Sequence, residues 1–199
     1  MNKIIITAGG TSEPIDTVRK ITNSSSGKLG AMIAEEIKAL NPNVEIHYVA
    51  SKKAIRPNVD IIYHEVNDTM SVQKTLHEII DQDVISIVHS MAISDYIIDS
   101  VLDKTGEELD RTKKISSDND RLIINLIKAP KIINELKALN PNSKLIGFKL
   151  LNKVSENDLI DAANKQIKAA GSDYVVCNDL SEINATQHKA IVVNNEGKK

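Results

Sequence analysis

A loop rich in glycine and serine follows the first apolar run of the sequence. Gly9 and Gly10 come directly after the run at 3–8, and the tetrapeptide Ser-Ser-Ser-Gly at 24–27 precedes a helical pattern that begins near Lys28. Free backbone amides, serine hydroxyls and the dipole at a helix N-terminus attract phosphate groups. The pattern therefore indicates an anion site, although the composition alone fits a serine-capped helix after a turn equally well.

This loop matches neither of two common phosphate-binding signatures. The sequence has no G-x-G-x-x-G joining a strand to a helix and no G-x-x-x-x-G-K-[ST]. These absences disfavour a dinucleotide-dependent enzyme. An NAD(P)-dependent reductase and a non-catalytic nucleotide-binding protein nevertheless stay as alternatives, because a fold does not determine a function.

Apolar runs of strand length recur along the chain, with amphipathic stripes between several of them. Continuous Ile and Val runs are typical of strands buried on both faces, as in a parallel sheet. The predicted strands lie at 3–8, 44–50, 60–66, 84–90, 144–149 and 173–177, and the predicted helices carry stripes at 29–40, 132–139 and 159–167. The alternation predicts one domain, residues 1–199, with an α/β fold: a Rossmann-like three-layer sandwich around a mainly parallel sheet.

The segment at 94–120 breaks this alternation. It is polar, rich in Asp, Lys, Ser and Thr, and too long for an ordinary connection in a compact domain. We predict that it forms an active-site flap. The segments at 122–128 and 189–194 are candidates for antiparallel strands outside the main sheet.

The composition limits the partners and the compartment. With 25 Lys and Arg against 27 Asp and Glu, the formal net charge is -2, so no broad positive field attracts nucleic acid or anionic lipid. The single cysteine, Cys177, excludes an internal disulfide, and the five histidines lack metal-ligand spacing. No run approaches the ~20 apolar residues of a membrane helix, and the start lacks the longer apolar region of a signal peptide. We expect a cytoplasmic protein with no membrane or nucleic-acid partner.

The run from Ile6 to Gly30, ITAGGTSEPIDTVRKITNSSSGKLG, resembles the amino-terminal signature of phosphopantothenate-cysteine ligases. In that signature a threonine-glycine turn precedes an arginine, an asparagine and S-S-G-K-x-G; here these are Thr7, Gly9, Arg19, Asn23 and residues 25–30. Later stretches agree with the family in the same order: 90–96 with A-x-x-D-Y, 113–115 with K-I, 130–133 with P-D-I, 147–150 with a G-F or S-F-K-L turn, and 177–179 with A-N-D.

The resemblance implies a stand-alone ligase that joins 4'-phosphopantothenate to L-cysteine in coenzyme A biosynthesis. The pantothenate carboxylate would attack the α-phosphorus of a nucleotide, and the cysteine amine would then displace the nucleoside monophosphate. CTP is expected rather than ATP, although the turn G-F-K-L-L at 147–151 is closer to eukaryotic and short, unfused bacterial forms. Mg²⁺ is expected with the triphosphate, held mostly by phosphate oxygens and water, so no protein metal site is predicted. A homodimer is also implied.

The resemblance also assigns roles to individual residues. Arg19 and Asn23 would face the reacting acyl group, and Lys114 would neutralise nucleotide phosphate, which makes these three the predicted catalytic residues. The 4'-phosphate would bind at Ser25, Ser26, Gly27, Lys28 and Gly30. The nucleotide would contact Gly10, Ser90, Met91, Ala92, Asp95, Lys114, Pro130, Ile132, Phe148 and Lys165.

Three of these assignments have structural alternatives. Asn23 is also typical of a turn, Lys114 could be half of a solvated charge pair with Lys113, and Phe148 could pack in the core. The sequence also departs from the family. Two family lysines would fall near Gln166 and Ala170, and a closing helix expected after the last strand is missing or truncated.

Overall fold

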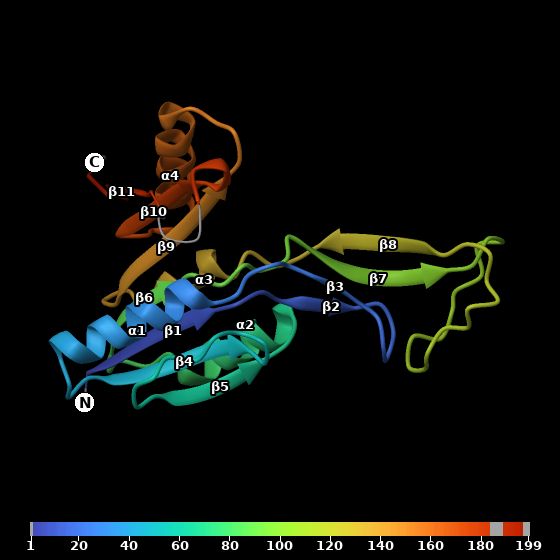
Figure 1. The fold of residues 1–199 in the computed structure, drawn as a ribbon, viewed down its shortest axis with the longest axis horizontal. Helices are drawn as coiled ribbons and strands as arrows, with labels where there is room; N and C mark the ends of the chain where they lie inside the picture. Colours follow the sequence, from blue (N-terminus) through green and yellow to red (C-terminus); the bar gives the residue numbers. More distant parts are fainter. Residues whose placement is uncertain (1, 184–188, 197–199) are drawn as a thin grey trace.

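Figure 1 shows the computed structural model of the protein, which describes residues 2–183 and 189–196. Its body is a seven-stranded sheet. The strands are β1 (Lys3–Ala8), β4 (Glu45–Ser51), β5 (Ile62–Val66), β6 (Val84–His89), β9 (Lys144–Leu151), β10 (Tyr174–Asp179) and β11 (Ile191–Asn194). Their order across the sheet is β11-β10-β9-β6-β1-β4-β5, and all neighbours are parallel except β10 and β11.

Four helices cover the two faces of this sheet. They are α1 (Lys28–Leu40), α2 (Thr69–Ile79), α3 (Ile133–Leu139) and α4 (Glu156–Ala170). Helix α1 packs through Ala34 against one face, beside Ile6 and Tyr48. Helices α2 and α3 cover the other face, and α4 packs on β10 and β11. A short 3₁₀ helix, η1 (Leu180–Glu182), follows β10.

The chain reverses its direction across the sheet between β1 and β6. From β1 it continues to β4 and β5 on one side, and then returns to place β6, β9 and β10 on the other side. The loops that follow β1 and β6 therefore diverge over opposite faces. In open parallel sheets a ligand crevice forms at this switch point, outside the carboxyl ends of the strands.

An arm projects from the body on one side (Figure 1). It consists of two antiparallel pairs, β2 (Ser12–Pro14) with β3 (Lys20–Thr22) and β7 (Tyr96–Leu102) with β8 (Ile123–Lys128), and of the loop at 103–122. The arm has a small apolar core of its own, built around Ile98, Val101 and Ile115.

The predicted sheet and helices are confirmed, with corrections at the arm and the last strand. All six predicted strands of the body form and pair in parallel, and the three predicted helices form. Helix α2 and the β2–β3 pair were not predicted. Part of the predicted flap is regular structure, since 96–102 forms β7, and the loop proper is 103–122. The segment at 122–128 forms β8 outside the main sheet as expected, whereas β11 lies within that sheet because it pairs along the free edge of β10.

Within the described residues, no helix combines the length and apolar character needed to cross a membrane.

Candidate active site

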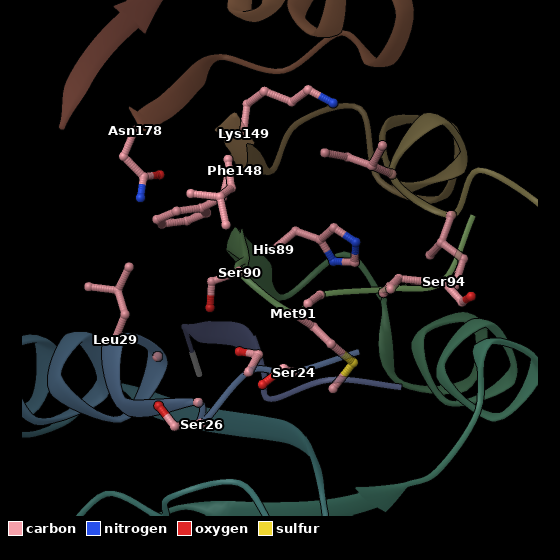
Figure 2. Close-up of a pocket in the computed structure, with 18 of the residues that line it drawn as sticks. Ser24, Ser26, Leu29, His89, Ser90, Met91, Ser94, Phe148, Lys149 and Asn178 are labelled. Atoms are coloured by element: carbon pink, nitrogen blue, oxygen red, sulfur yellow. The ribbon is translucent and has the colours of Figure 1, made fainter. Parts of the chain in front are cut away.

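A cavity of about 720 Å³ lies at the carboxyl ends of the parallel strands. Its walls come from the segment at 24–30 after β1, the segment at 89–95 after β6, the start of α3 at 130–133 and the end of β9 at 148–150. Figure 2 shows Ser24 and Ser26 on one side and Phe148, Lys149 and Asn178 on the other, with His89, Ser90 and Met91 between them. The cavity therefore occupies the switch point of the sheet.

The serine loop, residues 24–27, ends in the amino terminus of α1. Gly27 is the N-cap residue and has φ 72°, a left-handed conformation that glycine adopts readily. The Ser26 hydroxyl accepts a hydrogen bond from the backbone N–H of Lys28 at 3.3 Å. The next two amides of α1, at Leu29 and Gly30, have no acceptor in the part of the chain that the structure describes. These donors and the helix dipole make the loop suited to an anion.

Thr7 organises the wall that follows β6. Its hydroxyl accepts a hydrogen bond from the backbone N–H of Met91 at 3.1 Å and lies 3.2 Å from Nδ1 of His89, while its carbonyl accepts the Ser90 hydroxyl at 2.6 Å. Burial lowers the pKa of His89 to about 4. His89 is therefore neutral at pH 7 and adds no charge to the cavity.

Within residues 2–183 and 189–196, the charged side chains that line the cavity are three lysines and one carboxylate: Lys28, Lys131, Lys149 and Asp95. Asp95 forms an ion pair with Lys131 at the start of α3. Both side chains are more than half exposed, so this pair is screened by solvent. The surplus of positive charge is local, since the whole chain carries a formal charge of -2. The cavity thus favours an anionic ligand.

Most of the residues predicted from the sequence to bind substrates meet in this cavity. Phe148 lies there half-buried, and it also packs against the core on the α1 face; its contact with a nucleotide base stays a prediction. The predicted residues that line the cavity are Ser25, Ser26, Gly27, Lys28, Gly30, Ser90, Met91, Ala92, Asp95, Pro130, Ile132 and Phe148. Five predicted residues do not line it: Gly10, Arg19, Asn23, Lys114 and Lys165.

Asn23 lies just before the serine loop and is held by Thr11. The Asn23 amide donates to the Thr11 hydroxyl at 3.4 Å, and the same hydroxyl accepts the backbone N–H of Ser94, a lining residue, at 3.0 Å. The backbone of Gly10 packs against the backbone of Asn23, since a Cβ at position 10 would overlap the Asn23 carbonyl. Thr11, which is 1% exposed, therefore connects Asn23 to the edge of the cavity.

Arg19 and Lys114 both belong to the arm. The Arg19 guanidinium is bound to Asp16 and to the carbonyl of Ile115. Lys114 precedes Ile115 in the loop at 103–122, and its side chain is exposed. Neither cation lines the cavity in this structure. Their predicted catalytic roles therefore require the arm to move toward a bound ligand.

Lys165 is exposed and does not line the cavity, and its neighbour Gln166 lines it instead. Gln166 lies three residues after Ala163 and four before Ala170, both buried, so helical periodicity places it on the inner face of α4. The sequence prediction also missed other lining residues, among them Lys149 and Asn178. Their positions, at the ends of β9 and β10, were the available signal.

A parallel sheet in this strand order, with a serine loop and a positively charged cavity at its switch point, defines a Rossmann-like α/β protein with a site suited to phosphorylated ligands. The chain belongs to the family of the DNA/pantothenate metabolism flavoprotein C-terminal domain, which it matches over residues 1–199. This agrees with the resemblance found in the sequence.

Individual relatives support the same family. The chain is 34% identical over 193 residues to the Coenzyme A biosynthesis bifunctional protein CoaBC of Thermococcus kodakarensis, an alignment that covers 96% of this chain and 44% of that protein. It is 31% identical over 183 residues to the protein of the same name from Methanocaldococcus jannaschii, covering 91% and 41%. The chain thus spans less than half the length of these curated relatives.

The fold is also that of a solved structure. The crystal structure of the DNA/pantothenate metabolism flavoprotein from Streptococcus pneumoniae matches with a TM-score of 0.87 and 36% identity, covering 98% of this chain and 90% of that one. The crystal structure of the C-terminal domain of a Coenzyme A biosynthesis bifunctional protein CoaBC shares the fold with a TM-score of 0.71 at 23% identity.

Proposed function

We propose that this protein is a phosphopantothenate-cysteine ligase, which joins 4'-phosphopantothenate to L-cysteine in coenzyme A biosynthesis. The observation that carries the proposal is the cavity at the switch point. It brings together the serine loop, the segment after β6 and Phe148, which are far apart in the sequence and each resemble the ligase family. Relatives named for coenzyme A biosynthesis support the same pathway.

The proposed reaction has two steps. A carboxylate is a poor electrophile, so it must be activated before an amine can attack it. An oxygen of the pantothenate carboxylate bonds to the α-phosphorus of the nucleotide, and the bond from that phosphorus to the bridging oxygen breaks, releasing pyrophosphate. The cysteine amine then attacks the acyl carbon, loses a proton and displaces the nucleoside monophosphate. Both steps depend mainly on positioning and on stabilisation of developing charge.

Each wall of the cavity has a role in this proposal. The serine loop and the free amides of α1 bind the 4'-phosphate, so the acyl end extends toward Asn23. The Asn23 amide donates to the oxyanion that forms when cysteine attacks, without adding a charge that would stabilise the starting carboxylate. Phe148 contacts the base of the nucleotide. Lys114 approaches the phosphates when the loop at 103–122 closes.

We propose CTP as the preferred nucleotide, from the resemblance to bacterial ligases. The G-F-K-L-L turn at 147–151, which is closer to eukaryotic and short, unfused bacterial forms, weakens the support for this preference. Mg²⁺ accompanies the triphosphate in this proposal. Among the described residues that line the cavity, Asp95 is the only carboxylate. One exposed carboxylate fits an ion that is held mostly by phosphate oxygens and water.

A homodimer is part of the same proposal, and the arm supports it. The arm exposes apolar side chains that a monomer would leave in water: Val18, Ile21, Tyr96, Leu126 and Ile127 are between 44% and 64% exposed. Burying such residues against a second copy is favourable, at about 25 cal/mol per Å². Light scattering should give twice the monomer mass, and Ile127→Lys should shift the protein toward monomer. A monomeric parent at micromolar concentration would refute the dimer.

Turnover tests the ligase directly. Purified protein is incubated with phosphopantothenate, L-cysteine, Mg²⁺ and either CTP or ATP, and pyrophosphate and the ligated product are measured. We expect pyrophosphate release that requires phosphopantothenate, a higher kcat/KM with CTP, and very poor use of pantothenate without its phosphate, because the serine loop and the free amides of α1 would lose the anion that they bind. A non-catalytic binding protein would release none, and a reductase would instead oxidise NAD(P)H.

A further inference from the structure

His89 is a polar side chain of the cavity to which the proposed reaction gives no role. It ends β6, lines the cavity and is 8% exposed. Figure 2 shows its ring between Met91 and Lys149. Within residues 2–183 and 189–196, the fully buried side-chain atoms without a hydrogen-bond partner are Nε2 of Gln166 and Oγ of Ser172. Nε2 of His89 also lacks a partner there but is not one of these buried atoms, so it is accessible from the cavity.

Thr7 determines which nitrogen of His89 carries the hydrogen. The Thr7 side chain is fully buried, and its oxygen already accepts the backbone N–H of Met91 at 3.1 Å. Its own O–H needs an acceptor, because buried polar groups are nearly always hydrogen-bonded. In the part of the chain that the structure describes, Nδ1 of His89, at 3.2 Å, is the acceptor within reach. Nδ1 therefore accepts, and Nε2 of the neutral ring carries the hydrogen that faces the cavity.

The segment that follows His89 is fixed to the loop that carries Asn23. Gly10 and Ala92 pair as a parallel β-bridge, and the Ala92 carbonyl accepts the backbone N–H of Thr11 at 3.0 Å. The Thr11 carbonyl in turn accepts the backbone N–H of Asn23 at 3.0 Å. The imidazole of His89 and the amide of Asn23 are thus two neutral donors mounted on one hydrogen-bonded unit. Donors that are already in place stabilise developing charge without the cost of reorganisation.

We infer that the Nε2–H of His89 binds one oxygen of the phosphopantothenate carboxylate and forms an oxyanion hole together with the Asn23 amide. This inference rests on the proposed ligase function. In the first step the other carboxylate oxygen bonds to phosphorus, and the hydrogen bond to His89 holds the group in place for that attack. In the second step the cysteine amine adds to the acyl carbon, and the bound oxygen takes the electron pair of the carbonyl π bond. The pair returns as the nucleoside monophosphate leaves. A neutral donor stabilises this transient charge without over-stabilising the starting carboxylate.

Two substitutions of His89 separate this role from a structural one. The amide nitrogen of Gln can take the place of Nε2 and keep the donor, whereas Asn reaches only the place of Nδ1 and keeps the contact with Thr7. His89→Asn should lower kcat ~10²-fold or more and leave the nucleotide KM within about twofold, while His89→Gln should retain kcat within about tenfold. His77→Asn is the control, because His77 pairs with Glu135 on the surface, and its kcat should equal that of the parent. If His89 only anchors Thr7, the order of the two variants reverses, and that order or equal activity in both refutes the inference.

Nitrogen NMR of the full chain, labelled in its histidine rings, tests the donor without turnover. At pH 7 the His89 ring, assigned by its absence from the His89→Gln spectrum, should carry its hydrogen on Nε2, and this resonance should shift on saturation with phosphopantothenate alone. A hydrogen on Nδ1, or a resonance that bound phosphopantothenate leaves unchanged, refutes the role of His89 even in an active ligase. A parent that binds phosphopantothenate and shifts His89 but releases no pyrophosphate refutes the ligase and keeps the carboxylate contact. A parent that does not bind phosphopantothenate refutes both.

Discussion

Arg19 and Asp16 form an ion pair in the turn that joins β2 and β3, with Nε and Nη2 of Arg19 at 2.9 and 2.5 Å from Oδ2 of Asp16. The same oxygen accepts the backbone N–H of Ile115 at 3.1 Å, and Nη2 donates to the Ile115 carbonyl at 2.7 Å. Both backbone groups of Ile115 are thus held by residues about a hundred positions earlier. The loop that carries Lys114 is anchored at this point.

Asp16→Asn tests this anchor. The hydrogen bonds from Arg19 hold the pKa of Asp16 well below its usual range, so the carboxylate is charged at neutral pH, and its stabilising effect is lost only as the pH falls through the acid range. Removing the charge should speed amide hydrogen exchange across 103–122. Asp120→Asn is the control, because the Lys104–Asp120 pair in the same loop is exposed. Equal exchange in both variants would contradict the anchor.

Lys114→Ala tests the loop as an active-site flap. If the exposed lysine approaches nucleotide phosphate when the loop closes, its loss should raise the nucleotide KM or lower kcat far more than it changes phosphopantothenate binding. Lys113→Ala is the neighbouring control, since Lys113 pairs with Asp110 on the surface. Unchanged nucleotide kinetics in Lys114→Ala would mean that Lys114, like Lys113, is a solvated surface lysine without a role in nucleotide binding.

Asn23→Asp separates the two proposed chemical steps. The variant keeps the shape of the side chain but places a negative charge where the second oxyanion forms, and loss of one such donor typically lowers the rate ~10²–10³-fold. The first step forms a bond to phosphorus and should suffer less. We expect a folded variant that releases about one equivalent of pyrophosphate per site and accumulates acyl-nucleotide, seen by mass spectrometry after quenching. Ligation at close to the parent rate would make Asn23 a turn residue only.

Gly27→Ala should disable the serine loop. The residue has φ 72°, and an added Cβ would lie 2.9 Å from Cβ of Ala54 and 3.1 Å from the Gly9 nitrogen. We expect a loss of roughly 1–3 kcal/mol in the free energy of unfolding, from strain in the left-handed region, and much weaker binding of phosphopantothenate in calorimetry. Gly106→Ala is a useful comparison, because that glycine also has positive φ but no atom within 4 Å of an added Cβ. If both variants bind phosphopantothenate as the parent does, the loop does not hold the phosphate.

His89 should make stability depend on pH. Burial lowers its pKa from 6.5 to about 4, so the unfolded chain takes up a proton before the folded protein does. The contribution of His89 is fully present above pH 6.5 and is lost as the pH falls toward 4, up to about 3 kcal/mol. The pKa of His64 is also lowered, by burial and by the neighbouring His47, so protonation of His64 at low pH destabilises the fold in the same direction. The difference between the parent and His89→Gln in denaturant titrations isolates His89, and parallel pH profiles would contradict this account.

The sequence by itself determined the layered fold and the serine loop. Buried parallel strands read as continuous apolar runs and amphipathic helices carry a repeating stripe, so 3–8, 84–90 and 29–40 could be predicted from neighbouring residues alone. The serine loop could be predicted for the same reason, because Gly27 and the start of α1 are contiguous in the sequence. The family resemblance added the stretches after β6 and β9, but it could not say which of their side chains would line one cavity.

Only the tertiary structure decided the partners of residues far apart in the chain. Arg19 carries no sequence signal that it binds Ile115 rather than a substrate, since that contact depends on how the arm folds back. β7 could not be predicted because its partner β8 lies beyond a polar loop, and because Asp99 and Ser100 interrupt its apolar residues. Gln166 rather than Lys165 faces the cavity because one residue turns a helix by about 100°, and the packing of α4 against Gly147 selects which side is inward.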